Sequence, residues 1–275
     1  MPSYVEQLFS VSGRVALFTG GAGVLSGAIA RGLGKAGARI VLTDIASLDE
    51  RVQQLRTEGI ETRGYRMDVL DKADIERVAE QVQREVGRVD ILLNAAGGNI
   101  PEASTSPERR FFDLPLEALQ RVVYLNLFGG AILPSQVFAR QMLENEEGGV
   151  IINFSSMSAF KPLTRVLGYS AAKAAVSNFT QWLAVHIAQE YSPKVRVNAI
   201  APGFFLTHQN RYLLLDEQGN LTPRGQAILA HTPMGRFGEP DDLVGTILWL
   251  ASPASAFVTG AVIPIDGGFS AFSGV

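Results

Sequence analysis

The chain of 275 residues has no cysteine, only 3 histidines and only 2 tryptophans. The absence of cysteine excludes disulfides and thiolate metal sites, and we expect no bound metal. The formal net charge is only -3 and the sequence pI is about 5.7, so the chain has no excess of positive charge that would favour binding to nucleic acid or an anionic membrane surface. We therefore expect a small-molecule substrate, with no nucleic-acid or membrane partner.

Two kinds of hydrophobic segment are also missing. The opening residues MPSYVEQLFS lack the basic region and apolar core of a secretory signal. No apolar run approaches the roughly eighteen residues of a membrane span. The default expectation is a cytoplasmic protein.

Apolar residues are abundant at 47 %, against 19 % charged residues, which suits a large core. Short β-branched and apolar runs recur along the chain, and helical patterns such as 71–87 separate them. The predicted strands cover 14–19, 39–44, 61–69, 89–97, 149–156 and 195–203. This alternation predicts a single doubly wound Rossmann domain over residues 1–275, an α/β fold whose parallel sheet of about seven strands has helices on both faces. Ligands are expected at the carboxyl ends of the strands.

One stretch has a chemically suggestive spacing. Tyr169 and Lys173 are four residues apart in a helix-favouring segment that continues as AAKAAV, so both side chains project from one face. An ammonium about 4 Å from a partly buried phenol is worth roughly 4 kcal/mol, or about three pKa units, and could bring the phenol pKa towards neutrality. The alternative is a surface helix with a half-buried tyrosine and a solvated lysine.

The serine pair that ends at Ser156, together with YSAAK at 169–173, resembles the active site of the short-chain dehydrogenase/reductase family. Other segments resemble that family's motifs in the same order: TGGAG at 19–23, NAAG at 94–97, Asn126 with Leu127, PG at 202–203 with Thr207, and IDGG at 265–268. The resemblance implies four catalytic residues: Asn126, Ser156, Tyr169 and Lys173.

Each of these four has a role that the resemblance implies. Tyr169 exchanges a proton with the substrate oxygen, which Ser156 hydrogen-bonds. Lys173 lowers the phenol pKa and binds the nicotinamide ribose. Asn126 holds a water that joins Lys173 to solvent, although an asparagine within a helix can also be a buried capping or bridging residue.

The resemblance implies a nicotinamide dinucleotide cofactor, and Asp44 favours NAD. The implied cofactor-binding residues are Gly20, Gly23, Val24, Leu25, Asp44, Asp68, Val69, Asn94, Ala95, Ala96, Gly97, Tyr169, Lys173, Pro202, Gly203 and Thr207. The glycine turn departs from the family pattern, because Val24 and Ser26 stand where glycines are usual. Since a β-branched residue tolerates positive φ poorly, we predict a different path for this loop.

Asp44 is the residue that favours NAD over NADP. It ends a predicted strand, where its carboxylate can accept both hydroxyls of an adenosine ribose and repel a 2′-phosphate. Its alternative role is a helix N-cap. The nearest basic residues in sequence, Arg39 and Arg51, reach that phosphate only if folding brings them there. By resemblance Asp68 binds the adenine amino group while Val69 lines the ring, with a plain strand-end turn as the alternative.

Two stretches, 98–114 and 203–235, are predicted substrate loops, because long loops at this edge of the sheet often carry function. Candidate substrate residues are Asn99, Ser158, His208, Asn210 and Arg211. The segments GGAGVL, AAGGN, GFFLTHQNR and DGGFSAFSGV resemble the D-mannonate oxidoreductase, or fructuronate reductase, branch of the family. That branch implies a ketone of a sugar acid whose carboxylate Arg211 grips, in preference to Arg109 and Arg110, which sit beside acidic Glu108.

Two alternatives remain for the function. The same chemistry could act on a polyol or another ketone, and a catalytically silent dinucleotide-binding protein could share the fold. Family resemblance also implies a homotetramer that packs through the helix with Tyr169 and through the C-terminal strand.

Overall fold

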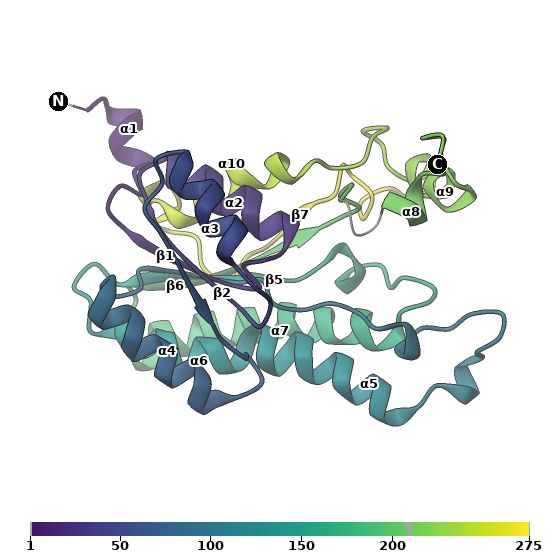
Figure 1. Ribbon diagram of the computed structural model, residues 1–275, viewed down its shortest axis with the longest axis horizontal. Coiled ribbons are helices and arrows are strands. Elements are labelled where there is room, and N and C mark those ends of the chain that lie inside the picture. The colour runs from purple at the N-terminus through teal and green to yellow at the C-terminus, as the bar shows by residue number, and fades with distance from the viewer. Residues whose placement is uncertain (1, 208–210, 275) are drawn as a thin grey trace.

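The computed structural model describes residues 2–207 and 211–274, and its core is one parallel sheet (Figure 1). The strands are β1 Val15–Thr19, β2 Arg39–Asp44, β3 Thr62–Arg66, β4 Ile91–Asn94, β5 Gly149–Phe154, β6 Val195–Pro202 and β7 Val262–Ile265. Their order across the sheet is β3-β2-β1-β4-β5-β6-β7, and every pairing is parallel. The predicted doubly wound Rossmann fold with about seven strands is confirmed. The order reverses between β1 and β4, where this fold opens a ligand crevice.

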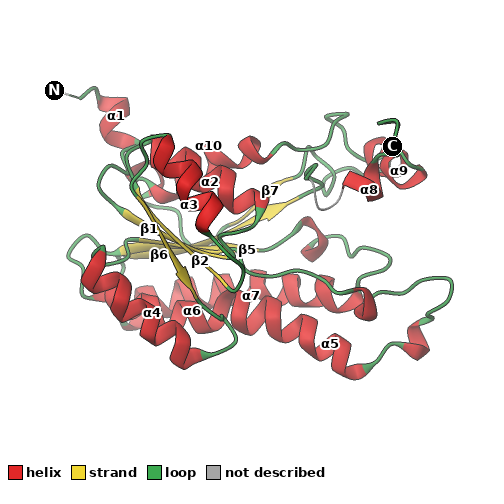
Figure 2. Ribbon diagram, viewed as in Figure 1, coloured by secondary structure: helices red, strands yellow, loops and turns green. Residues whose placement is uncertain are grey.

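Helices cover both faces of the sheet. They are α1 Tyr4–Leu8, α2 Val24–Lys35, α3 Asp49–Thr57, α4 Lys72–Glu85, α5 Leu116–Val123, α6 Leu133–Leu143, α7 Leu167–Glu190, α8 Arg211–Leu214, α9 Pro223–Ala230 and α10 Val244–Ala251. Figure 2 shows α2, α3 and α10 on one side of the strands and α4, α6 and α7 on the other. Each side has its own buried apolar cluster, which accounts for the near-continuous apolar strands.

The predicted element boundaries differ from the structure by a few residues. The predicted strand at 39–44 coincides with β2, and the predicted helix at 71–87 is α4, whose N-cap Asp71 accepts hydrogen bonds from the Ala73 and Asp74 amides. The predicted strand at 61–69 ends earlier, at Arg66, because the chain turns at Asp68. The predicted loop at 203–235 contains the short helices α8 and α9.

One helical stretch, Leu116–Leu143, joins α5 and α6 through a π-helix at Tyr124–Ile132. An 18-residue window within it has a mean hydropathy of 1.5, so by length and composition alone this helical stretch could cross a membrane, although charged and polar residues interrupt its apolar runs. Part of it packs in the core, since Val122, Ala131 and Phe138 are buried, whereas Leu116 and Tyr124 are exposed.

Candidate active site

A cleft of about 840 Å³ opens beside the carboxyl ends of β1, β2 and β4. Its lining includes most of the predicted cofactor residues: Gly20, Gly23, Val24, Leu25, Asp44, Asp68, Val69, Ala95, Ala96, Gly97, Tyr169, Gly203 and Thr207. Sequence reasoning missed Ala22, Ser26, Ile45, Ala46, Met67, Leu70, Gly98, Leu125, Phe154 and Phe205. Each of these lies within two residues of a predicted one, so extending every motif by two positions would have found them.

The glycine turn brings the start of α2 to the cleft. Gly20 has φ of 67°, and a Cβ on it would lie 2.8 Å from the Ala96 Cα, so only glycine fits there. Val24 is the first residue of α2, and Gly23 precedes it as an N-cap without a side-chain acceptor. The altered turn therefore places Val24 in helical backbone, and the first amides of α2 are left for an anion at this end of the cleft.

Asp44 ends β2 and lines the cleft. Its two carboxylate oxygens each accept one backbone hydrogen bond, from Ala22 N at 3.0 Å and from Ala46 N at 3.0 Å. The alternative role as a helix N-cap is wrong, because the N-cap of α3 is Leu48. The carboxylate is thus held in place while it faces the cleft.

The two arginines nearest to Asp44 in sequence are engaged elsewhere. Arg39 is the first residue of β2, at the opposite end of that strand, and it pairs with Glu61 at 2.9 Å. The Arg51 guanidinium packs against Gly27 of α2, where a Cβ would lie 1.8 Å from its Nη1. Neither residue lines the cleft.

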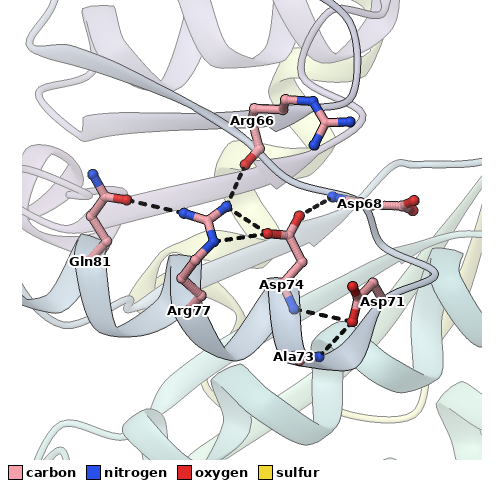
Figure 3. Close-up of polar contacts among 7 residues, drawn as sticks. All are labelled: Arg66, Asp68, Asp71, Ala73, Asp74, Arg77 and Gln81. Carbon is pink, nitrogen blue, oxygen red and sulfur yellow. Dashed lines mark hydrogen bonds and ion pairs between the residues drawn. The ribbon is translucent and has the colours of Figure 1, made fainter.

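A network on α4 fixes the turn at Asp68 (Figure 3). The Asp74 carboxylate accepts from Asp68 N at 2.7 Å and from Arg77 at 2.6 Å, and the Asp68 amide is the largest cause that lowers the pKa of Asp74. Figure 3 shows the Asp68 carboxylate pointing away from this network. One of its oxygens accepts from Leu70 N at 2.9 Å, so the predicted strand-end turn exists, and the residue also lines the cleft.

Asn126 lies in the π-helix and joins it to the strand end after β4. Its amide donates to Gly98 O at 2.6 Å and to Val122 O at 2.8 Å, and it accepts from Gly98 N at 3.0 Å. A Cβ on Gly97 would lie 2.6 Å from the Asn126 Oδ1 and 3.3 Å from the Lys173 Nζ. The side chain is therefore a bridging asparagine, as the alternative interpretation held, and it lies close to Lys173. Its role in holding a water stays a prediction.

Ser156 follows β5 and has a polarised hydroxyl. Its Oγ accepts from Ser158 N at 3.2 Å, and its hydroxyl is hydrogen-bonded to Tyr169. The preceding Ser155, which sequence reasoning passed over, donates to Lys173 O at 3.0 Å and lies 2.7 Å from the Ser177 Oγ. These bonds tie the end of β5 to α7 and so set the catalytic helix beside Ser156.

Tyr169 and Lys173 meet on α7, as the spacing predicted. Lys173 is only 4 % exposed, so the alternative with a solvated lysine is wrong. Its Nζ donates to Phe154 O at 2.7 Å and lies 5.6 Å from the centre of the Tyr169 ring. Burial lowers the pKa of Lys173 to about 8.

The expected fall in the Tyr169 pKa is not seen. Burial raises the pKa of the phenol, and the Ser156 hydroxyl opposes that rise only in part. Burial is the largest cause, and the Lys173 ammonium, which donates to Phe154 O and lies 5.6 Å from the ring centre, does not offset it. A protonated Tyr169 is consequently the form favoured at neutral pH.

Asn94, Lys173 and Pro202 are not among the residues that line the cleft, although all three were predicted to bind cofactor. Asn94 is fully buried and donates to Ser135 Oγ at 3.0 Å and to Asn153 Oδ1 at 2.8 Å. The Asn94 side chain therefore joins β4 to β5 and α6, and its role in cofactor binding stays a prediction. Pro202 is buried at the end of β6.

The predicted substrate residues differ in their surroundings. Asn99 lines the cleft and donates to Ser104 Oγ at 2.7 Å. Ser158 is buried, and its Oγ has no hydrogen-bond partner in the described part of the chain. Arg211 is exposed at the start of α8, and its amide bonds to Thr207 O at 3.0 Å. His208 and Asn210 lie outside the described residues.

The similarity to known proteins extends over nearly the whole chain. A family model described as Enoyl-(Acyl carrier protein) reductase matches residues 22–270. An uncharacterized oxidoreductase of Bacillus subtilis (strain 168) is 46 % identical over 277 residues, which cover 97 % of this chain and 98 % of that protein.

Solved structures agree with this match. A structure provisionally named D-mannonate oxidoreductase, from Haemophilus influenzae and with bound NAD, is 43 % identical, has a TM-score of 0.91 and covers 98 % of this chain and 100 % of its own. A gluconate 5-dehydrogenase from Burkholderia cenocepacia J2315, in complex with NADP and tartrate, is 30 % identical, has a TM-score of 0.83 and shares the same coverage, 98 % and 100 %. The cleft therefore lies in a fold that relatives use to bind a nicotinamide dinucleotide.

Proposed function

From the premise that this chain belongs to the short-chain dehydrogenase/reductase family and is an oxidoreductase acting on CH–OH groups, we propose that it is NAD(H)-dependent and interconverts the ketone and secondary alcohol of a sugar acid of the D-fructuronate/D-mannonate type. The observation that carries the proposal is the meeting of Ser156, Tyr169 and Lys173 beside the dinucleotide cleft. No other group of residues in the described ranges joins a phenol, a hydroxyl and a buried ammonium in this way.

The residues of the cleft fit a nicotinamide dinucleotide. The uncapped first turn of α2 offers backbone amides to the pyrophosphate, and the turn at Gly20 gives the close backbone approach that it needs. Asp44 would hold the adenosine ribose, while Asp68 and Val69 would border the adenine. When bound, the nicotinamide supplies or accepts the hydride.

The chain's own side chains would manage the proton and the developing charge. In the reductive direction Tyr169 donates its proton to the substrate oxygen, for which its raised pKa keeps it protonated. The Ser156 hydroxyl, which is hydrogen-bonded to Tyr169 in the structure, would donate to the same oxygen and stabilise negative charge as it develops. The Lys173 ammonium, held by Phe154 O, places a positive charge beside the phenolate that Tyr169 leaves behind.

NAD(H) is the cofactor we propose, on the strength of Asp44. Its carboxylate faces the cleft, and a 2′-phosphate there would meet a like charge at close range. The NAD bound by the relative of 43 % identity supports this choice, whereas the gluconate 5-dehydrogenase carries NADP.

The proposed substrate class rests on basic and polar side chains near the mouth of the cleft. Arg109 donates to Pro101 O at 2.7 Å and Arg110 pairs with Asp113 at 3.1 Å, so both are held within their own loop. Arg211 follows the cleft residue Thr207 and is the arginine we propose for the carboxylate. The two stretches 98–114 and 203–235 are proposed to enclose the substrate, with Asn99 and Ser158 facing its hydroxyls.

A substrate panel tests this function. Purified protein would be assayed by nicotinamide absorbance with fructuronate and related keto sugar acids, and with the uncharged ketoses of matching length as controls. The expected result is a higher kcat/KM for the acids and for NADH over NADPH. Preference for an uncharged ketose would reject the sugar-acid assignment and leave the general dehydrogenase function.

We also propose that the protein works in the cytoplasm as a homotetramer. The supporting observation is an apolar face on α7, where Leu167, Trp182 and Val185 are 45 %, 56 % and 57 % exposed. The strand β7 is an edge of the sheet and is only partly buried. An unpaired strand edge and an exposed apolar helix face are features that subunit contacts commonly cover.

A further inference from the structure

Arg66 lies beside Asp44, although the two are far apart in sequence. Arg66 is the last residue of β3, and its Cα pairs with the Cα of Asp44 in the parallel ladder. Two positions earlier the paired residues are Leu42 and Gly64, and both face α3: Leu42 belongs to that core, and a Cβ on Gly64 would contact Val52 and Leu48.

Because side chains in a strand alternate between the two faces, Asp44 and Arg66 share the α3 face with Leu42 and Gly64. In Figure 3 the dashed contact of Arg66 ends at its carbonyl oxygen, and its guanidinium makes none of the contacts drawn. The Arg66 carbonyl accepts from Arg77 Nη2 at 3.1 Å, so the backbone at this point is anchored. The Arg66 charge lies near enough to Asp74 to help lower the pKa of that carboxyl, without a hydrogen bond or ion pair to it.

The Arg66 guanidinium is available to a ligand. The side chain is exposed, and within residues 2–207 and 211–274 no hydrogen bond or ion pair holds its guanidinium. The neighbouring Arg56 is different, because it donates to Thr62 O at 2.9 Å. Arg63, three residues earlier on β3, has its side chain on the opposite face near Glu85, whose pKa it helps to lower, and it borders the far side of the same groove that Arg66 lines.

The cofactor cleft continues into a space that Arg66 lines. A polar groove of about 570 Å³ runs beside β3, and Ile45 and Ala46 border both the groove and the cleft. These two residues follow Asp44 directly, so the groove begins where the adenosine ribose of a dinucleotide would end. The groove is therefore placed to receive a group attached to that ribose at its 2′ position.

We propose that Arg66 is a specificity-determining residue for the adenosine 2′-phosphate, so that Asp44 and Arg66 together set the ratio of NAD(H) to NADP(H) affinity. The inference rests on the proposed dinucleotide function. Asp44 repels the phosphate, whereas the guanidinium of Arg66 attracts it through charge-assisted hydrogen bonds. The protein then prefers NAD(H) but retains measurable affinity for NADP(H), and removing the Asp44 charge exposes a phosphate site that already exists.

The test measures dissociation constants for NADH and NADPH by nicotinamide fluorescence, without substrate. The variants are Arg66→Gln, Asp44→Asn and the double variant, and Arg63→Gln is the matched control, with the same loss of charge on the same strand but the other face. Asp44→Asn should improve NADPH affinity relative to NADH affinity by about tenfold. Arg66→Gln should weaken NADPH affinity relative to NADH affinity by about tenfold, both in the wild type and in the Asp44→Asn variant. Arg63→Gln should change the ratio by less than about twofold.

Three outcomes of the binding and turnover measurements separate the role of Arg66 from the proposed function. If Arg66→Gln changes the ratio of NADH to NADPH affinity no more than Arg63→Gln does, the proposed role of Arg66 is overturned. Failure of the wild type to bind either cofactor would overturn the proposed function together with this inference. Normal cofactor binding without turnover of any sugar acid would reject the proposed substrate, while the expected shift in the NADH to NADPH ratio would still support Arg66.

Discussion

At the scale of single residues, the buried ammonium of Lys173 gives the site its expected pH dependence. Its pKa is lowered to about 8, because burial disfavours the charged form. Reduction needs the charged form beside Tyr169, so kcat/KM should be level through neutral pH and fall as the pH rises through about 8. The measurement is kcat/KM for the ketone with NADH from about pH 6 to about pH 10, and a profile without an alkaline fall would contradict this role.

The same group contributes to stability with a defined sign. The ordinary lysine pKa is 10.5, so between about 8 and 10.5 the unfolded chain binds more protons than the folded chain. The contribution of Lys173 to the free energy of unfolding therefore rises with pH across that window. Below about pH 8 the folded protein carries the full cost of the buried charge.

Arg211 carries the substrate prediction. Replacing it by Met should raise KM for the sugar acid and spare an uncharged ketose, because only the acid offers a carboxylate for two parallel hydrogen bonds. The loss should be about 2 to 4 kcal/mol if the bound pair becomes buried, and smaller if Arg211 stays exposed as it is in the structure. Steady-state KM values for both substrates check this, with Arg110→Met as the matched control. Equal weakening of both substrates would contradict the assignment.

At the scale of elements, the π-helix packs in close backbone contact with the segment that follows β4. A Cβ on Gly130 would lie 2.6 Å from Ala96 O, and Ala96 lines the cleft. Gly130→Ala should lower the free energy of unfolding by about 1 to 3 kcal/mol, because the helix must move away from the strand end. Thermal and urea unfolding measure the effect.

Gly245→Ala is the control for this prediction. Gly245 lies in α10, and nothing lies within 4 Å of the position that its Cβ would take. Alanine there should be neutral or stabilise by up to about 1 kcal/mol, since it is the better helix former. Equal effects of the two substitutions would show that the contact between Gly130 and Ala96 is unimportant.

Sequence reasoning reached the strands, the main helices and most of the cleft, because those depend on local patterns. Apolar runs located β2 to the residue, and the motif around Tyr169 located the catalytic helix. The features that sequence reasoning could not predict depend on pairing between distant segments of the chain. The bond from Asn94 to Asn153 of the neighbouring strand, the bonds from Asn126 to Gly98 and the register of Asp44 with Arg66 all require the assembled strands.

At the scale of the whole molecule, the apolar face of α7 predicts the oligomeric state. Trp182 is 56 % exposed and stacks on His186 with ring centres 4.7 Å apart, so a rigid aromatic surface faces outward. Sedimentation should give a tetramer for the wild type and smaller species for Trp182→Arg, because a charge would be buried at the contact. Tyr4→Arg, on the exposed α1, should leave the tetramer intact. A monomeric wild type would contradict the proposal.

The central claim is that Tyr169 is the proton donor of a nicotinamide-dependent dehydrogenase, and Tyr169→Phe tests it most directly. The change removes one hydroxyl and little volume from the half-buried ring. Fluorescence titration with NADH, beside steady-state rates on the best substrate of the panel, should show nearly unchanged cofactor binding and a rate at least about 10²-fold lower. Retention of more than about a tenth of the wild-type rate would contradict the acid–base role of Tyr169.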